Sequence, residues 1–362
     1  MRLNRRHSAG FGLVEVMVAL LIGMFGVLVM MQVLSVSEEQ KRATTGGNDA
    51  MNEGVMALYA LQSDVRMSGY GISDVKLLGC KLTLRAGVVL SNLAPVTINS
   101  PDIPAGDANT DTLLVFYGNG YGSPQGDQVN NTGNSVLTPS MFTTNDWVIR
   151  AAPARVPQCI LPLDQVTSVT SPSTVNLISG VTNMPLTTTL FNIGQSYRAV
   201  GYAVRGGNLT MCDFADTTKN CASAGSWSSI ANNIVSLRAQ YGRDTATAGA
   251  MDGVVDSYDQ ATPDWVAVPN TACQWTRISA LRLVIVSRSV QFEKTAVTTL
   301  APTWDGSVAN NPAGSIASPI VLNGDANWQN YRYKVFQTFV PIRNVSWMGA
   351  GVLPLPQAVP SC

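Results

Sequence analysis

The stretch that decides the fold is RRHSAGFGLVEVMVALLIGMFGVLVMMQVL, residues 5–34. From Phe11 to Leu34 it is almost wholly apolar and carries one charged residue, Glu15. A helix of about 24 residues is about 36 Å long, enough to cross a hydrocarbon core of about 30 Å. The arginines of the first ten residues precede this run, and positive charge tends to stay in the cytoplasm. The sequence therefore predicts a cytoplasmic N-terminus and places residues 35–362 on the outer side of the membrane.

Glu15 argues against an ordinary membrane anchor, which is the plain alternative for such a segment. A carboxylate inside the hydrocarbon costs about 3 kcal/mol, so a charge there is functional by default and needs a partner. A cleaved secretory signal is also disfavoured, because the apolar run is long and no A-x-A site follows it.

The residues GFGLVE at 10–15 resemble the type IV prepilin signature, in which a short basic leader ends in Gly before Phe, three residues, Glu and a long apolar helix. The resemblance implies that a prepilin peptidase cuts between Gly10 and Phe11 and methylates the new N-terminus of Phe11. It also implies that Glu15 pairs with the N-terminal ammonium of a neighbouring subunit. Each of these charges, buried in a filament core, needs the other, because an unpaired buried charge is very costly.

The composition favours a β-rich exported protein. Hydrophobic residues make up 46% of the 362 residues and charged residues only 13%, with a formal net charge of zero. Because the leader contributes arginines and no acid, the rest of the chain is slightly acidic. A general basic surface for nucleic acid is therefore absent, and no direct nucleic-acid binding is predicted.

Cysteine and histidine usage limits the chemistry. The six cysteines are Cys80, Cys159, Cys212, Cys221, Cys273 and Cys362. No C-x-x-C pair occurs, which disfavours zinc ribbons and thioredoxin-like sites and favours up to three disulfides in an exported domain. The connectivity stays open, as does the alternative that some thiols are buried and free; Cys212–Cys221 is the favoured pair. His7 is the one histidine and lies in the basic N-terminal stretch. If that stretch is removed, no histidine is left for a triad, a Cys–His dyad or a His-ligated metal, so neither an enzyme nor a cofactor is predicted.

The helical pattern continues beyond the membrane segment. Apolar residues recur in a stripe at Val55, Met56, Leu58, Tyr59, Leu61 and Val65. We expect one long helix whose outer half packs on the domain, with Gly69 and Gly71 as stop signals. Gly46–Gly47 is a weak point that favours a kink or a break. Asp64 and Arg66, two positions apart, face different ways and each is expected to meet the domain or a partner helix.

The sequence pattern changes after Ser73, where short runs of Val, Leu, Ile and Thr alternate with clusters of Gly, Pro, Asn and Asp. The expected fold class is α+β, with a cleaved leader at 1–10, a long N-terminal helix at 11–72 (11–34 in the membrane or filament core) and a β-rich domain with disulfides at 73–362. Gly206–Gly207 is a tight-turn candidate. Residues 100–135 and 301–326 read as long surface loops, either for binding or simply variable.

Four later segments resemble PilW-type minor pilins in order and spacing. They are LQSDVRMSGYG (61–71), AQYGRDTATAGAMDGVVDSYD (239–259), ISALRLVIVSRS (278–289) and YRYKVFQTFVPIRN (331–344). The resemblance implies a minor pilin that joins other minor pilins in the complex that primes pilus assembly, and that sits at the fibre tip. Its partners would be other minor pilins, the major pilin, the prepilin peptidase, the inner membrane before assembly and a tip adhesin. The mature protein would end in the extracellular pilus.

Two alternative functions stay open, a type II secretion pseudopilin and a tip adhesin or sensor. An anchored periplasmic enzyme is disfavoured by the lack of histidine after residue 7. A weak calcium candidate is the acidic cluster of Asp244, Asp252, Asp256 and Asp259. The EF-hand pattern lacks its distal Glu here, so a solvated turn is the competing interpretation.

Overall fold

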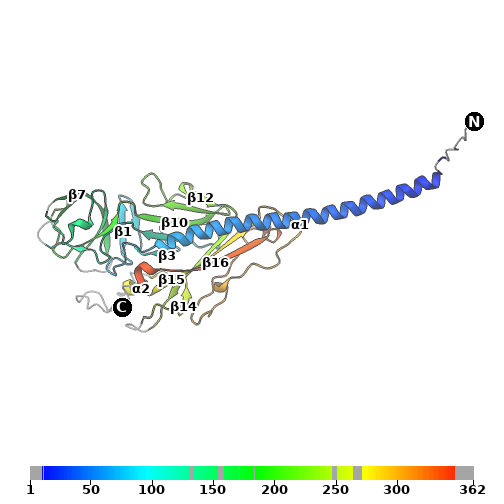
Figure 1. Cartoon of the computed structure of the whole chain (residues 1–362). Helices are drawn as coiled ribbons and strands as arrows, with labels where there is room; N and C mark the ends of the chain where they lie inside the picture. The colour runs from blue at the N-terminus through cyan, green and yellow to red at the C-terminus, as the bar shows by residue number, and fades with distance from the viewer. Residues whose placement is uncertain are drawn as a thin grey trace, which may run out of the picture.

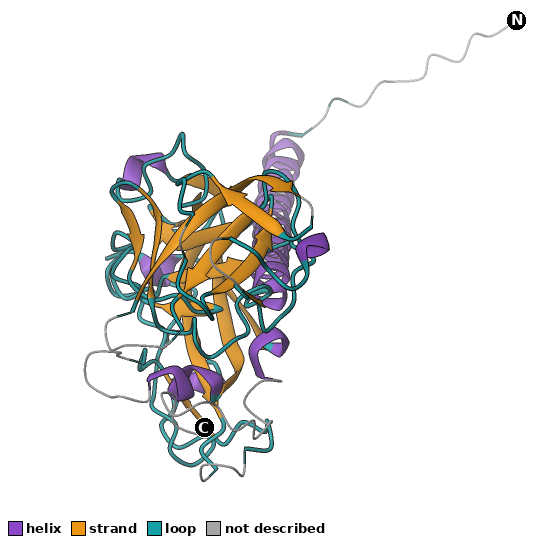
Figure 2. Ribbon diagram, turned by 90° about the vertical axis from the view of Figure 1, so that its left-hand side faces the viewer, coloured by secondary structure: helices purple, strands orange, loops and turns teal. Residues whose placement is uncertain are grey.

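A long helix projects from a β-rich body (Figure 1). The computed structural model describes residues 10, 12–130, 134–153, 159–170, 172–182, 184–246, 251–263 and 271–346. Helix α1 spans Leu13–Met67, 55 residues, a length of about 80 Å. Its first half stands clear of the body (Figure 1), and its second half lies along one side of the strands (Figure 2). This arrangement, with disulfides in the body, confirms the predicted α+β fold.

Helix α1 runs without a break through Gly46–Gly47, so a division into two helices is wrong. Gly46 is buried and faces the Cβ of Ser289, and this tertiary contact outweighs the low helix propensity of glycine. The predicted stop is confirmed, since the helix ends at Met67 and Gly69 and Gly71 follow with φ of +80° and +81°. Such φ values favour glycine and turn the chain away from the helix axis.

The first sheet has the strand order β2-β1-β7-β6-β9-β5, with β8 pairing on β7. Its strands are β1 (Lys81–Arg85), β2 (Val88–Leu90), β5 (Asp127–Gln128), β6 (Trp147–Ala151), β7 (Ile160–Thr170), β8 (Thr174–Leu177) and β9 (Thr189–Gly194). Strands β1 and β7 are parallel, and the disulfide Cys80–Cys159 joins the residues that immediately precede them. This sheet forms the end of the body farthest from the N-terminus (Figure 1).

The second sheet is the middle layer of the body, in the order β12-β11-β10-β4-β3. Its strands are β3 (Val96–Ile98), β4 (Leu113–Tyr117), β10 (Arg198–Arg205), β11 (Asn208–Asp213) and β12 (Ser228–Ala231). Alternate residues of β4 serve two cores. Leu113 and Val115 face α1 and the third sheet, whereas Leu114 and Phe116 face the first sheet. Burial on both faces explains why β4 is a continuous apolar run.

The third sheet has the order β14-β13-β15-β16. Its strands are β13 (Ile234–Arg243), β14 (Ser257–Asp259), β15 (Ile278–Arg288) and β16 (Tyr333–Pro341). Leu281, Leu283 and Ile285 point to the core shared with α1 and the second sheet. The shorter helices are α2 (Thr271–Thr276), α3 (Arg343–Ser346) and the 3₁₀ turns η1 (Pro139–Met141), η2 (Ala224–Ser226), η3 (Asp305–Ser307) and η4 (Trp328–Asn330).

Two loop assignments from the sequence need correction. Residues 100–135 contain β4, one of the most buried strands. Residues 301–326 form no strand, but Trp304, Ile320 and Leu322 are buried against the outer face of the third sheet. Gly, Asn and Pro dominate the composition of both segments and mask the apolar residues that pack in the core. This composition explains the error. The tight turn is confirmed: Gly206 and Gly207, at φ of +57° and +71°, join β10 to β11.

Candidate assembly surface

The Glu15 carboxylate lies in the first turn of α1 and is exposed. Among the described residues it has no hydrogen-bond or ion-pair partner. An acidic side chain in a first helical turn is favoured by the helix dipole, which supports the start of the helix at this point. Gly10 lies two residues before Gly12, the N-cap of the helix, and is exposed; a Cβ at this position would have open space around it among the described residues. Phe11, the predicted methylation site, lies outside the described residues.

The apolar first half of α1 touches none of the body residues that the structure describes. Its large side chains, from Leu13 to Val36, are 48–78% exposed. By length and composition this helix could cross a membrane, and its most apolar 18-residue window has a mean hydropathy of 2.6 with none of it buried. An exposed apolar surface of this size needs lipid or other helices to cover it. It therefore suits a segment that lies in a bilayer or packs among other helices.

The body holds the second half of α1 through small residues. The buried positions are Gly46, Ala50, Gly54, Ala57, Leu61 and Val65, which recur every three or four residues on one face. Glycine and alanine let the helix backbone come close to the strands. The apolar stripe expected from the sequence is therefore only partly right. Leu61 and Val65 are buried, but Met56 and Tyr59 are 66% and 72% exposed.

Asp64 fastens α1 to the second sheet. Its carboxylate accepts hydrogen bonds from the hydroxyls of Tyr117, at 3.0 Å, and Tyr202. Burial raises the pKa of both tyrosines, and the negative charge of Asp64 raises it further. Both hydroxyls therefore stay protonated and keep donating. The expectation that Asp64 meets the domain is confirmed, whereas the side chain of Arg66 is exposed.

Three more polar contacts tie α1 to the body along its length. Glu53 accepts a hydrogen bond from the backbone N–H of Asn232, at 3.0 Å, beside β12. The Ser287 hydroxyl donates to the carbonyl of Ala50, at 2.7 Å. At the end of the helix the Asn344 side chain donates to the carbonyls of Met67 and Ser68, at 3.2 and 2.9 Å. These carbonyls have no partner within the helix, so Asn344 acts as a cap supplied from the far end of the chain.

The opposite face of this half-helix carries apolar side chains that remain in solvent. Met51, Val55 and Tyr59, spaced four residues apart, are 52%, 50% and 72% exposed. They extend the exposed apolar surface of residues 13–36 along the helix. Sequence reasoning assigned part of this face to the body, because large apolar residues usually mark the buried side. The glycine and alanine residues on the other face were the sequence signal for the buried side, and sequence reasoning did not use them.

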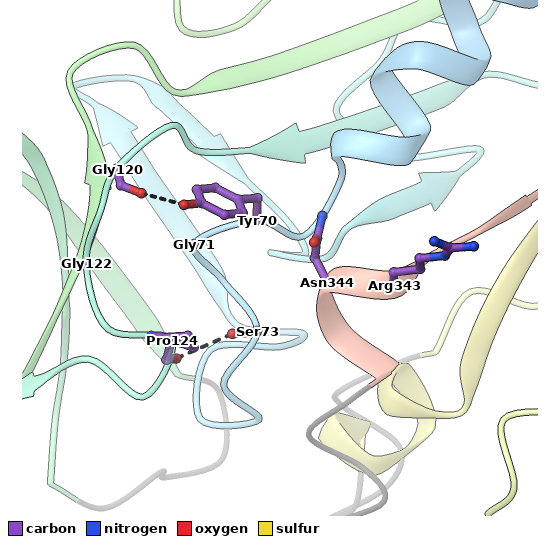
Figure 3. A pocket seen from close by; sticks show the side chains of 8 residues that line it. All are labelled: Tyr70, Gly71, Ser73, Gly120, Gly122, Pro124, Arg343 and Asn344. Atoms are coloured by element: carbon purple, nitrogen blue, oxygen red, sulfur yellow. Dashed lines mark hydrogen bonds between the residues drawn. The ribbon is translucent and has the colours of Figure 1, made fainter.

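A pocket of about 350 Å³ lies where α1 ends. It is lined by Tyr70, Gly71 and Ser73 after the helix, by residues of the 120–124 loop, and by Arg343 and Asn344 of α3 (Figure 3). The Tyr70 hydroxyl donates to the carbonyl of Gly120 at 2.8 Å, and the Ser73 hydroxyl donates to the carbonyl of Pro124 at 3.4 Å. These bonds join the chain after α1 to the 120–124 loop and fix the helix end against the first sheet.

Two disulfides have defined partners. They are Cys80–Cys159 and the favoured pair Cys212–Cys221, with sequence separations of 79 and 9. Cys273 is also disulfide-bonded, and Cys362 lies outside the described residues. No free cysteine occurs among the described ones. The sulfurs are thus structural, which suits an exported domain.

The carboxylates of the acidic cluster accept hydrogen bonds from backbone N–H groups of their own loop. Asp244 accepts from the N–H groups of Ala246 and Gly253, and Asp256 accepts from Thr245. Asp252 accepts from Val254, and Asp259 accepts from Ala261 and forms an ion pair with Arg243 at 2.7 Å. Within the described ranges no three acidic, histidine or cysteine side chains gather as a metal site would need. The arrangement favours the structured turn over the weak calcium candidate.

Two parts of this chain match known protein families. Residues 202–344 match the family described as Type IV Pilus-assembly protein W, and residues 5–31 match the Prokaryotic N-terminal methylation motif. The first match runs from β10 through the third sheet to α3, and so includes Tyr202 and Asn344. The second covers the leader, Glu15 and the apolar start of α1. No curated protein and no solved structure matches the chain.

Proposed function

We propose that this chain, a PilW-type, pilin-like protein of type IV pili, is a minor pilin that joins other minor pilins in the complex that starts pilus assembly, and that it sits at the fibre tip. It acts by assembly rather than catalysis. Residues 1–10 are the leader, residues 11–72 the assembly helix, and residues 73–362 the body that docks on neighbouring subunits.

One observation carries the proposal. An exposed apolar half-helix with a single carboxylate near its start continues without a break into a half-helix that is fastened to a folded body. The body therefore cannot swing freely about Gly46–Gly47, and the position of the helix start fixes the position of the body. Such a rigid unit transmits the register set at Glu15 to surfaces several tens of ångströms away.

The role of Glu15 follows from its isolation in the single chain. In the membrane or in a filament core the carboxylate is costly unless a positive charge meets it. After cleavage between Gly10 and Phe11, the ammonium group of a neighbouring chain is the cation that the same sequence supplies. Pairing the two charges sets the axial position of each subunit as it enters the filament. Before assembly, the apolar half-helix holds the protein in the inner membrane with its N-terminus in the cytoplasm.

The test is mass spectrometry of the mature N-terminus, with the full chain produced in a host that has or lacks prepilin peptidase. We expect a chain that begins with N-methylated Phe11 in the first host and retains residues 1–10 in the second. A variant with Gly10→Val should stay uncleaved in both, because it replaces the glycine that ends the leader in the prepilin signature. A mature chain that keeps its leader in the presence of the peptidase would contradict the pilin function.

A further inference from the structure

Strand β16 is unusually long for a strand at the edge of a sheet. It spans nine residues and is the terminal strand of the third sheet. The other terminal strands in the described chain, β2, β3, β5, β8, β12 and β14, have two to four residues each. Proteins commonly keep edge strands short because an open edge offers backbone groups to other chains. The long edge of β16 is the exception that requires an explanation.

The hydrogen-bond pattern shows which backbone groups of β16 face outward. Immediately beyond its two ends, Ser289 N–H donates to the carbonyl of Arg332 at 2.8 Å, and Ile342 N–H donates to the carbonyl of Ser279 at 2.9 Å. Since hydrogen-bonded pairs alternate along an antiparallel ladder, the even-numbered residues 334–340 bond to β15. The N–H and C=O groups of Val335, Gln337 and Phe339 therefore point away from the sheet. None of them has a hydrogen-bond partner among the described residues.

The sequence of this edge lacks the usual protection. Charges and prolines keep open edges from pairing, but here Lys334 and Pro341 stand only at its two ends. Between them the stretch VFQTFV, residues 335–340, is uncharged and rich in β-branched and aromatic residues. Phe339 is 47% exposed. Such a segment is suited to accept another strand.

The direction of β16 restricts what can pair with it. Its start lies beside Gly46 through Ser289, its middle places Phe336 against Gly54, and its end leads to Asn344 on the last carbonyls of α1. Strand and helix thus run in the same direction (Figure 1). A two-fold-symmetric pair of hydrogen-bonded β16 strands would be antiparallel and would point the two α1 helices in opposite directions. Two copies inserted in one membrane point the same way.

We infer that the outward edge of β16 binds an extended, uncharged strand of a different pilin-like subunit, by β-strand addition. This inference rests on the proposed function, because assembly through α1 is what brings another body beside β16. The exposed Met51, Val55 and Tyr59 lie on the same helix, so a helix of that neighbour can pack there while its body supplies the strand. Backbone bonds would give the strand its register, and the side chains around Phe339 would select apolar partners.

Hydrogen exchange of the full-length chain in detergent tests this directly, first alone and then co-purified with the other pilin-like subunits of its host. Alone, the amides of Val335, Gln337 and Phe339 should exchange fast and those of Phe336 and Thr338 slowly. In the complex the three outward amides should slow by about tenfold or more, as a hydrogen bond requires. Equal exchange in an intact complex would overturn the inference. Protection in the chain alone, or only in a homodimer, would overturn it too.

A matched pair of variants separates the backbone from the side chain. Gln337→Ala and Gln337→Pro both lose the side-chain contacts with Asp305, but only proline removes the outward N–H. Proline is tolerated at such edge positions because that N–H is outside the ladder. We expect the alanine variant to recover its partner at the wild-type level and the proline variant to recover about tenfold less. Equal recovery of the partner by the alanine and proline variants, both with wild-type thermal unfolding, would contradict the inference. If the proline variant unfolds the body, the hydrogen-exchange measurement decides. Failure of the wild type to form any complex would contradict the proposed function itself.

Discussion

The ring of Phe336 on β16 lies against the backbone of Gly54 in α1, with no room left for a side chain on the helix at that point. This contact lies in the middle of the buried face that runs from Gly46 to Val65. It sets how closely α1 approaches the third sheet, and so how the assembly helix is seated on the body. Glycine lowers helix propensity, but position 54 has no room for any side chain.

The first prediction is that Gly54→Ala destabilises the body. Alanine is favoured over glycine in a helix by about 1 kcal/mol, but crowding in a packed core costs about 1–3 kcal/mol. Because the ring of Phe336 must move, we expect a net loss of about 1 kcal/mol in the free energy of unfolding, measured by denaturant titration of the detergent-solubilised chain. Gly47→Ala is the matched control, since nothing lies within 4 Å of its position. It should gain about 0.5–1 kcal/mol. Equal effects at the two sites would contradict the packing argument.

The second prediction concerns Asp64. Replacing it with alanine leaves the hydroxyls of Tyr117 and Tyr202 without their acceptor, and an unpaired buried hydroxyl costs about 1–3 kcal/mol. We expect Asp64→Ala to lower the free energy of unfolding by about 2 kcal/mol. Adding Tyr202→Phe to this variant should cause little further loss, because the interaction is already gone. Ser63→Ala, on the exposed side of the same turn, is the control. Strictly additive losses in the double variant would show that the residues do not act together.

The third prediction is a loss of stability at alkaline pH. The pKa values of Tyr117 and Tyr202 are raised in the folded protein by burial and by Asp64, whereas in the unfolded chain they are about 10. The unfolded state therefore loses these protons first as pH rises, so the contribution of the two tyrosines to the free energy of unfolding should be constant below about pH 10 and fall above it. Thermal unfolding at pH 8–11 measures the slope. The variant with Tyr117→Phe and Tyr202→Phe should show a shallower fall; an unchanged slope would rule out these two groups as its source.

The fourth prediction ranks the two defined disulfides. In the chain-entropy account, a bond that closes a longer loop restricts the unfolded state more. Cys80–Cys159 closes a separation of 79 residues and Cys212–Cys221 one of 9. Replacing the first pair with serines should cost about 4 kcal/mol, and replacing the second about 2–3 kcal/mol. Denaturant unfolding of the two double variants gives the comparison, and a larger loss from the second pair would reverse the predicted order.

The fifth prediction concerns Glu15. Because the first half of α1 does not touch the body, Glu15→Ala should be processed normally and unfold at the same temperature as the wild type. Its incorporation into pili should fall strongly, since the neighbouring ammonium loses its partner. Immunoblots of sheared pili measure this. Glu38→Ala, an exposed acidic residue farther along the same helix, should assemble normally. Wild-type assembly by Glu15→Ala would remove the proposed role of this carboxylate.

Local signals in the sequence predicted a substantial part of this protein. The apolar run after Gly10 and the glycines at 69 and 71 bounded the long helix, and the alternating runs after Ser73 indicated strands. Gly206–Gly207 marked a hairpin because positive φ values are a local requirement that glycine meets. The favoured pair Cys212–Cys221 could be predicted for a similar reason, since the two cysteines are close in the chain. The assembly role of Gly10, Phe11 and Glu15 remains a prediction of the same motif.

Features that depend on neighbouring residues could be predicted from the sequence alone: a charge within an apolar helix, the turns, and the short apolar runs that form strands. The folded structure is needed to see which face of α1 is buried, because glycine and alanine mark close backbone approach only once the opposing strand is known. It also paired Asp64 with two tyrosines and brought Asn344 to the end of α1 from 276–278 residues away. It left the outer edge of β16 without a partner within the described chain. These relations join segments far apart in sequence, so they depend on the packing of three layers and leave no local pattern to read.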